Sequence, residues 1–116
     1  MTLTTIPLMF KIVLYAPFLR NIQGITLYPF ILLKNKHLRK DKFLMNHEEI
    51  HLQQQKELLV FPFYVLYLSN YAFNLLRYRN HYKAYLNICF EREAYENEYN
   101  LHYLKERKIW AFWKYW

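Results

Sequence analysis

The chain is organised around the segment Asn46-His47-Glu48-Glu49-Ile50-His51-Leu52-Gln53-Gln54-Gln55. On a helix, residues four positions apart lie on one face, one turn apart, so His47 and His51 can offer both imidazoles to a single metal ion. Zinc binds imidazole nitrogen at about 2.0–2.1 Å, which this spacing allows. The sequence therefore predicts a helix here that carries two zinc ligands.

Glu48 directly follows the first of these ligands, and its side chain points about 100° further round the helix. A carboxylate at that angle lies beside a metal ion and can take a proton from a water that zinc has activated, because zinc lowers the pKa of that water to about 7. We therefore expect Glu48 to act as a general base. The alternative is a solvated helix face, which Glu49 and Gln53 would also suit. We expect the Gln54 side chain to be solvated rather than to form a hydrogen bond with one of the metal-binding residues.

The composition predicts one domain over residues 1–116, long enough for a single modest core. The chain has a single glycine, Gly24, so sharp turns are few and long helices are expected after residue 42. The only cysteine, Cys89, cannot form an intramolecular disulfide, which fits a reducing compartment. The apolar run Ile6 to Phe18 has no basic region before it and is interrupted by Lys11, so it is not typical of a signal peptide.

The N-terminal part predicts a small antiparallel hairpin or sheet. Met9 to Tyr15 can form a strand or a short helix that ends near Pro17. Ile25 to Leu33 is β-branched and aromatic, which favours one strand. Because Pro29 cannot donate to a hydrogen-bond ladder, that strand should be an edge strand or carry a bulge.

The rest of the chain predicts about three helices, so the fold class is α+β and mostly α. Asp41 is the expected N-cap of the helix that carries the two histidines. That helix should end near Pro62, because the residue before a proline is disfavoured in a helix. Two more helices are expected, over residues 63–79 and 82–107.

Leu58 to Leu76 is a stretch of nineteen residues without a charge, long enough to span a bilayer. If it did so, every downstream residue would begin on the far side of the membrane from His51. A third zinc ligand from that part of the chain could then not reach the metal. We therefore expect a buried or interfacial helix.

A catalytic zinc site needs three protein ligands and an open position. Chain reversals near residues 60 and 80 would place three helices side by side and bring Glu91 level with His51. A shift of two residues in either turn would favour Glu93 instead. The two side chains point about 200° apart on a helix, so only one can bind, and the other should be a surface carboxylate. The remaining downstream candidates are His81, Cys89, Glu96, Glu98 and His102.

The net charge of +7 suits an anionic partner, either nucleic acid or the inner face of a membrane. No motif specific for nucleic acid is present. Residues 105–116 interleave basic and aromatic side chains, which favours an anionic membrane surface. The alternative is that these rings pack onto the helical core. The expected location is the cytoplasm or the inner face of the membrane.

Two motifs, His47-Glu48-x-x-His51 and Glu91-Arg92-Glu93-Ala94-Tyr95, resemble those of gluzincin zinc metallopeptidases. That group includes the CAAX-prenyl-protease and heat-shock membrane peptidases and the antirepressor peptidases of β-lactam sensors. The chain is also similar to a short bacterial family of small peptidase domains. The resemblance implies a minimal zincin-like fold that binds Zn²⁺ through His47, His51 and Glu91 and hydrolyses a peptide or protein substrate. It further implies that the strand before the motif helix pairs with the substrate backbone.

The chain departs from the family pattern at Tyr95, where the family has an Asp that orients a zinc-bound histidine. A phenol carries no charge at neutral pH. His81, His102 and Tyr99 are the candidates for stabilising an oxyanion. The alternatives to a peptidase are a non-catalytic zinc-binding or interaction domain on the same scaffold, and a basic, aromatic peripheral membrane protein. No pattern in the sequence predicts an oligomeric state.

Overall fold

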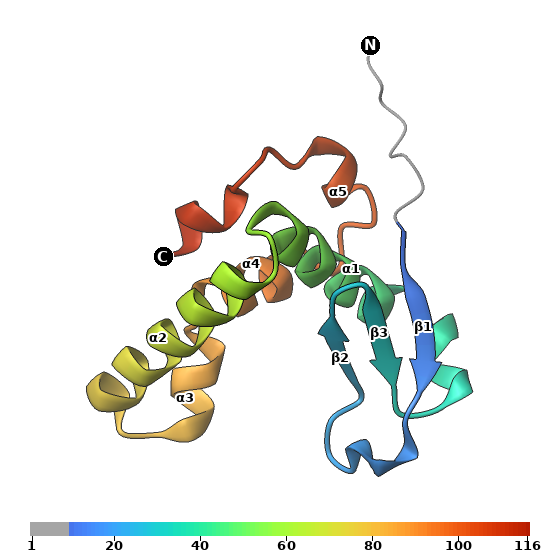
Figure 1. Ribbon diagram of the computed structural model, residues 1–116, viewed down its shortest axis with the longest axis horizontal. Coiled ribbons are helices and arrows are strands. Elements are labelled where there is room, and N and C mark those ends of the chain that lie inside the picture. Colours follow the sequence, from blue (N-terminus) through green and yellow to red (C-terminus); the bar gives the residue numbers. More distant parts are fainter. Residues whose placement is uncertain (1–9) are drawn as a thin grey trace.

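A small sheet followed by a series of helices makes up the computed structural model, which describes residues 10–116 (Figure 1). The fold is α+β and mostly α-helical, as predicted. Met9 and the start of the run Ile6 to Phe18 lie outside the described residues. The elements in chain order are β1 (Ile12–Tyr15), the 3-10 turn η1 (Pro17–Leu19), β2 (Gly24–Leu27), β3 (Phe30–Leu33), η2 (Lys36–Lys40), α1 (Lys42–Glu57), α2 (Phe61–Tyr78), α3 (His81–Leu86), α4 (Cys89–Asn97), α5 (Tyr103–Glu106) and η3 (Ala111–Tyr115).

The sheet is mixed, with strand order β1-β3-β2. The antiparallel hairpin that the sequence predicts is formed by β2 and β3, and β1 pairs with β3 in parallel. The single strand expected over Ile25 to Leu33 is wrong, because the chain turns at Tyr28 and Pro29 and Leu27 pairs with Phe30. Since Pro29 has no N–H to donate, the ladder breaks there and the segment folds back on itself.

Helix α1 begins as predicted and ends earlier than predicted. The Asp41 carboxylate accepts hydrogen bonds from the backbone N–H groups of Phe43 and Leu44, both 3.1 Å away, and so caps the first turn. The helix ends at Glu57 because Leu59 and Val60 adopt positive φ angles of 59° and 67°. Pro62 lies in the first turn of α2, where a backbone N–H would have no acceptor within the helix, so a proline is tolerated there.

The single helix expected over residues 82–107 is divided into α3, α4 and α5. Side chains from other helices form hydrogen bonds at both breaks. Asn70 of α2 accepts the N–H of Cys89 at 2.7 Å, which directs the start of α4. Asn46 of α1 places its Nδ2 atom 2.9–3.2 Å from the carbonyl oxygens of Asn97, Glu98 and Asn100, and so joins the turn after α4 to α1.

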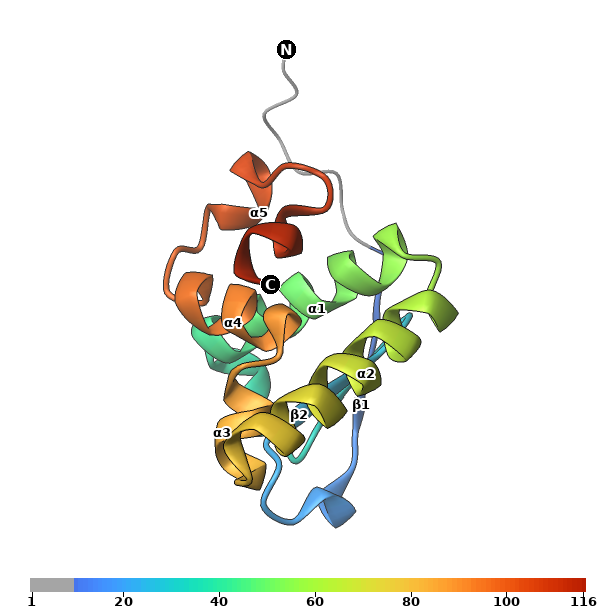
Figure 2. The ribbon, with the colours of Figure 1, turned by 90° about the vertical axis from the view of Figure 1, so that its left-hand side faces the viewer.

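Two apolar clusters hold these elements together. Ile31 and Leu33 of β3 pack against Leu52 of α1 and join the sheet to that helix. Phe90 of α4 lies with its ring centroid 4.6 Å from that of Phe63 in α2 and 4.8 Å from that of Phe112 in η3. Burying each such ring contributes roughly 1.5–3 kcal/mol. The second cluster therefore anchors the C-terminal turn beside α2 and α4, as Figure 2 shows.

Helix α2 lies across one face of the molecule, and the chain bends by 114° between it and α1. Within residues 10–116 no single helix is both long and apolar enough to cross a membrane, and α1 and α2 meet that test only as a bent pair.

Candidate metal centre

Three buried side chains from two helices converge on one point. His47, His51 and Glu91 offer ligand atoms that all lie within 4.8 Å of one another. The Nε2 atom of His51 lies 3.1 Å from Nε2 of His47 and 3.1 Å from Oε1 of Glu91, and the third side of the triangle, from His47 Nε2 to Glu91 Oε1, is 3.4 Å. Helix α1 thus supplies two of the predicted ligands and α4 the third.

The far side of the His47 ring is held by a carboxylate. Its Nδ1 atom lies 2.8 Å from Oε1 of Glu98. An ionised carboxylate can only accept, so Nδ1 carries the proton and Nε2 turns a lone pair toward the centre. The sequence offered Glu98 only as a further candidate ligand, whereas in the structure it bonds the outer nitrogen of His47, which is itself a candidate ligand. Tyr95, at the position of the family's Asp, instead packs edge-on against His47 with ring centroids 4.5 Å apart.

The far side of the His51 ring is held by an amide. Gln54 is fully buried, so the expectation that it is solvated is wrong. Its Nε2 group donates to Oε1 of Glu93 at 2.9 Å and to the carbonyl of Phe90 at 3.1 Å. Because both of these partners can only accept, the amide oxygen must face His51, whose Nδ1 lies 2.9 Å away and donates to it. Nε2 of His51 therefore also presents a lone pair.

These two tautomers leave three acceptors facing one another. The Nε2 lone pairs of His47 and His51 and the carboxylate of Glu91 share a buried space, and each neutral imidazole has its proton on the opposite nitrogen. Three converging acceptors repel one another unless a cation or a proton lies between them. Two imidazole nitrogens and one carboxylate oxygen are the donor set of many catalytic zinc sites. The residues present therefore fit a zinc ion.

In the metal-free chain, protonation of His51 relieves this repulsion. Burial alone lowers the pKa of His51, but the charge of Glu91 and the hydrogen bond to it raise the pKa by more, to about 9. For Glu91, burial raises the pKa, but the charge of a protonated His51 and the hydrogen bonds from His51 and Tyr67 outweigh burial and hold the pKa well below its usual range. Both shifts show that the centre attracts positive charge.

The second oxygen of Glu91 is held from α2. The Tyr67 hydroxyl donates to Oε2 of Glu91 at 2.6 Å, which leaves Oε1 to face the histidines. Burial, together with the charge of Glu91, raises the pKa of Tyr67, so the phenol remains a hydrogen-bond donor. Helices α1, α2 and α4 all contribute to the centre.

Glu48 lies beside this centre and turns toward the sheet. Its Oε1 atom accepts the Thr26 hydroxyl of β2 at 2.7 Å. Gly24, also of β2, provides the space for this carboxylate, because a Cβ there would meet Glu48 Oε2 at 3.4 Å and Leu33 Cδ2 at 3.2 Å. The predicted base is thus buried, oriented by a strand and separate from the three converging ligand atoms.

Glu93, the rival third ligand, faces a different partner. It is fully buried, so the expectation of a surface carboxylate is wrong. Its Oε2 atom lies 2.5 Å from Nε of Arg107 and 2.5 Å from the Tyr103 hydroxyl, and Arg107 also bridges to Glu57 at 2.5 Å. Through Gln54 this charge network reaches the back of His51. Nothing in the local sequence pattern indicated Arg107 or Glu57, which are brought together only by tertiary packing.

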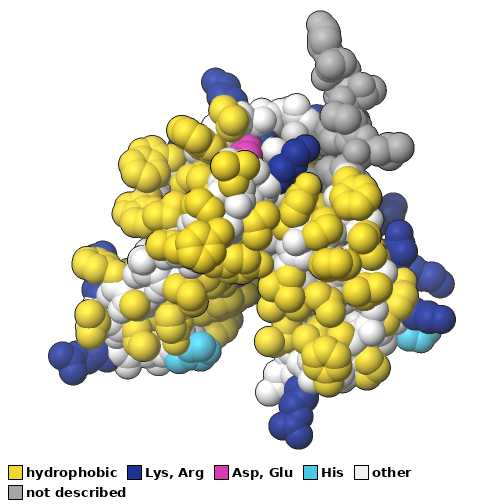
Figure 3. Space-filling view, viewed as in Figure 1, with side chains coloured by type: hydrophobic (Ala, Val, Ile, Leu, Met, Phe, Trp, Pro, Cys, Tyr) yellow, Lys and Arg dark blue, Asp and Glu magenta, His cyan; other side chains and the backbone are white. Residues whose placement is uncertain are grey.

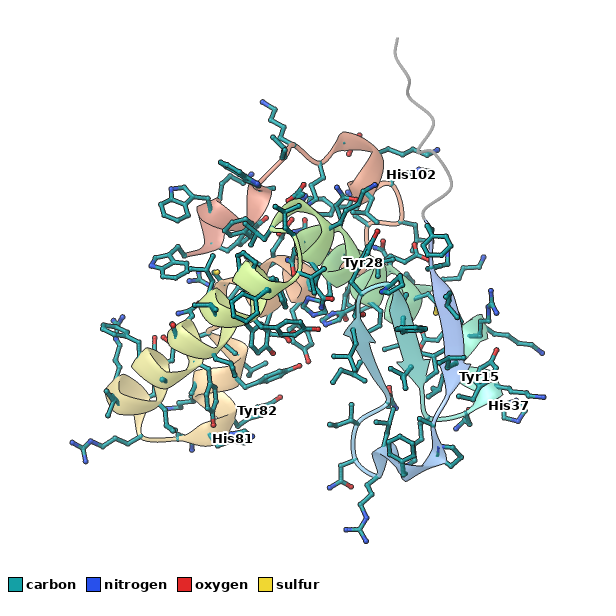
Figure 4. All side chains as sticks on the ribbon, in the orientation of Figure 1. Tyr15, Tyr28, His37, His81, Tyr82 and His102 are labelled. Carbon is teal, nitrogen blue, oxygen red and sulfur yellow. The ribbon has the colours of Figure 1, made fainter. Side chains whose placement is uncertain are left out.

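The three expected oxyanion candidates lie elsewhere. His81, the first residue of α3, bonds the Tyr71 hydroxyl at 2.6 Å, and Figure 4 shows His81 and His102 at opposite ends of the helical part. Tyr99 is exposed and packs against Phe43. The hydroxyl that contacts a residue of the centre is instead that of Tyr67, on Glu91, while the hydroxyls of Tyr85 and Tyr95 bond each other at 3.0 Å.

The ligand triangle, the two oriented histidines and the carboxylate beside them are the features that a function must explain. Comparison with models of protein families, with curated proteins and with solved structures finds no match to this chain.

Proposed function

We propose that this chain is a small zinc-dependent peptidase of the gluzincin type, with His47, His51 and Glu91 as metal ligands. The observation that carries the proposal is the convergence of two Nε2 lone pairs and one carboxylate oxygen within 4.8 Å. A bound zinc ion would supply a Lewis acid that polarises a peptide carbonyl and lowers the pKa of a water at its open position. Three protein ligands leave such a position.

Glu48 would move the protons of the reaction. The Thr26 hydroxyl fixes the direction of the Glu48 carboxylate, since it donates to Oε1 at 2.7 Å. The carboxylate takes a proton from the attacking water as the water oxygen bonds to the carbonyl carbon. It then returns that proton to the amide nitrogen as the C–N bond breaks. The products are a carboxylic acid and an amine.

The free edge of β2 is the surface that would align a substrate. Gln55 of α1 already occupies one end of this edge: it donates to the carbonyl of Thr26 at 2.8 Å and accepts the N–H of Tyr28 at 2.7 Å. In a strand, the N–H and C=O of one residue point to the same edge, so the N–H of Thr26 and the backbone of Gly24 also face outward. A peptide added there would pass directly beside Glu48.

The shape of the molecule is consistent with this approach. Figure 3 shows the surface hollowed between the sheet and the side formed by α2 and α3. On one side of the hollow, Glu48 accepts a hydrogen bond from Thr26 of β2. On the other side, Glu91 accepts one from Tyr67 of α2. The centre therefore lies where the two sides meet.

A non-catalytic zinc-binding domain is the second candidate, favoured by the burial of the ligands, each of which is 5–6% exposed. A test for peptide cleavage distinguishes the peptidase from the non-catalytic domain. Zinc-loaded protein incubated with a mixture of unstructured peptides should give cleavage products by mass spectrometry. Glu48→Gln should keep its zinc and lose at least about 10²-fold in rate, the usual scale for a general base.

Glu49→Gln is the matched control, because Glu49 is the adjacent carboxylate of α1 and pairs with Lys11 at 3.1 Å, outside the centre. It should cleave like the wild type. Cleavage that survives in Glu48→Gln would exclude Glu48 as the base. Tightly bound zinc in the wild type with no cleavage of any peptide would favour the non-catalytic domain.

A further inference from the structure

Helix α2 exposes a continuous apolar stripe. Phe61, Val65, Leu68 and Leu76 follow one another at helical spacing along its outer side, and their side chains are between 48% and 78% exposed. An outer helix of a water-soluble domain normally places charged and polar residues on this side. A single exposed apolar side chain is common, but a stripe along a whole helix marks a surface that meets an apolar environment.

The inner side of the same helix carries polar residues. Asn70 and Asn74 are buried, and each makes a hydrogen bond within the protein. Asn70 accepts the N–H of Cys89 at 2.7 Å, and Asn74 donates to the carbonyl of Ala84 at 3.2 Å. The usual polarity of a surface helix is therefore partly inverted in α2, with amides inside and large apolar side chains outside.

The C-terminal turn extends this apolar stripe. All three tryptophans of the chain, Trp110, Trp113 and Trp116, lie within its last seven residues, and each is at least 56% exposed. The buried ring of Phe112 holds the turn against the cluster that also contains Phe63 of α2. Of the two alternatives from the sequence, packing onto the core thus applies to Phe112, while the indoles face outward beside α2. Exposed tryptophan is typical of the boundary between membrane and water.

The outer face of the sheet is also apolar. Ile12 and Leu14 of β1 and Ile25 and Leu27 of β2 alternate with inward-facing residues and are each at least 36% exposed. Figure 3 shows that hydrophobic side chains gather over α2, η3 and the sheet on one face of the molecule. We call this surface the apolar face.

Charges around the apolar face are predominantly basic. The sequence contains no Asp or Glu in residues 58–90 or 107–116. Exposed basic side chains flank the stripe, with Arg77 and Arg79 at the end of α2 and Lys108 and Lys114 among the tryptophans. In Figure 3 Lys and Arg lie at the margins of the face, and acidic side chains are almost absent from it.

We propose that the apolar face rests on the surface of an anionic lipid bilayer, with α2 in the plane of the interface and the indoles among the headgroups. Apolar area with basic residues at its edge matches the acyl boundary and the negative headgroups of such a surface. A second copy of this chain would suit the face less well, because it would bring Arg77, Arg79, Lys108 and Lys114 against like charges without an acidic partner. The inference does not depend on the metal site.

The tryptophans provide a direct test, because every indole of the chain lies on the proposed surface. The full chain is titrated with vesicles of equimolar phosphatidylcholine and phosphatidylglycerol while its tryptophan emission is recorded. We expect a blue shift and quenching by lipids brominated on the acyl chain. Pure phosphatidylcholine vesicles, or high salt, should weaken binding at least about tenfold, because the headgroup attraction is lost or screened.

Leu68→Glu places a charge in the middle of the stripe and should lower vesicle binding at least about tenfold. Leu101→Glu is the matched control, since Leu101 is an exposed leucine in the loop after α4, and it should bind like the wild type. Circular dichroism checks that both variants fold. The proposal is overturned if the wild type shows no shift with anionic vesicles, if Leu68→Glu binds as well as the wild type, or if sedimentation shows a dimer that Leu68→Glu dissociates while vesicles bind neither form.

Discussion

His47 donates its Nδ1 proton to Glu98, whose Oε1 atom lies 2.8 Å away across 51 residues of sequence. This bond fixes the tautomer of His47 and aims its Nε2 lone pair at His51 and Glu91. In the gluzincin pattern an Asp directly after the conserved Ala supplies such a carboxylate. This chain has Tyr95 there, and the end of α4 brings Glu98 to the histidine instead.

Removing this carboxylate should weaken zinc binding. We expect Glu98→Ala to lose about 10–100-fold in zinc affinity, the usual effect of deleting a group that orients a ligand. Glu98→Gln keeps an acceptor without the charge and should lose less. Zinc affinity is measured by competition with a chelator, with Glu96→Ala as the control, because Glu96 is an exposed carboxylate on the same helix. Equal affinities of Glu98→Ala and Glu96→Ala would exclude the role of Glu98.

Removing Glu93 should cost stability. Its carboxylate pairs with Arg107, whose side chain is 2% exposed, and accepts a hydrogen bond from the Tyr103 hydroxyl. Truncation of Glu93 therefore leaves the buried guanidinium with one partner fewer. We expect Glu93→Ala to lower the free energy of unfolding by roughly 3–5 kcal/mol. Urea unfolding of the metal-free protein measures this. Glu106→Ala, which removes an exposed carboxylate, should change it by no more than about 0.5 kcal/mol. A similarly small change in Glu93→Ala would mean that the buried network contributes little.

Zinc affinity should depend on pH through His51. In the metal-free chain, burial lowers the pKa of His51, and Glu91 raises it by more, to about 9, so below that pH zinc must displace a proton. The apparent association constant should therefore rise about tenfold per pH unit between pH 7 and 9 and then level off. The folding stability of the metal-free protein depends on pH in the opposite direction. Because the pKa of His51 is raised from 6.5, the stability that the protonated His51–Glu91 pair contributes is complete below pH 6.5 and is lost as the pH rises toward 9. Chelator competition at several pH values measures the first trend, and a flat profile would contradict it.

Local spacing was sufficient to predict the helix that carries the histidines. His47 and His51 are separated by one turn, and Asp41 has the chemistry of an N-cap, so neither needs information from distant residues. Two reversals of the chain bring α4 beside α1, which was enough to expect an acidic residue near His51, and the motif that begins at Glu91 favoured that residue. The same reasoning left Glu93 open, because a small error in either turn exchanges the two carboxylates.

What the sequence did not reveal depends on contacts between distant residues. Asn46 bonds carbonyls at the end of α4 more than 50 residues away, and Arg107 reaches Glu57 across 50 residues. In neither case do the adjacent residues in the sequence indicate which distant residue will be the partner. Pro29 was correctly expected to disturb its strand, but a bulge and a hairpin turn have the same local signal, and only the pairing of Leu27 with Phe30 distinguishes them.

The central claim is that His47, His51 and Glu91 hold one zinc ion. The most direct test is the zinc content of the purified protein after mild dialysis, measured side by side for the wild type, Glu91→Ala and Glu96→Ala. We predict about one zinc per chain in the wild type and in Glu96→Ala, and none in Glu91→Ala, because two histidines alone bind zinc several kcal/mol more weakly. A wild-type level of zinc in Glu91→Ala, or no zinc in the folded wild type, would contradict the account.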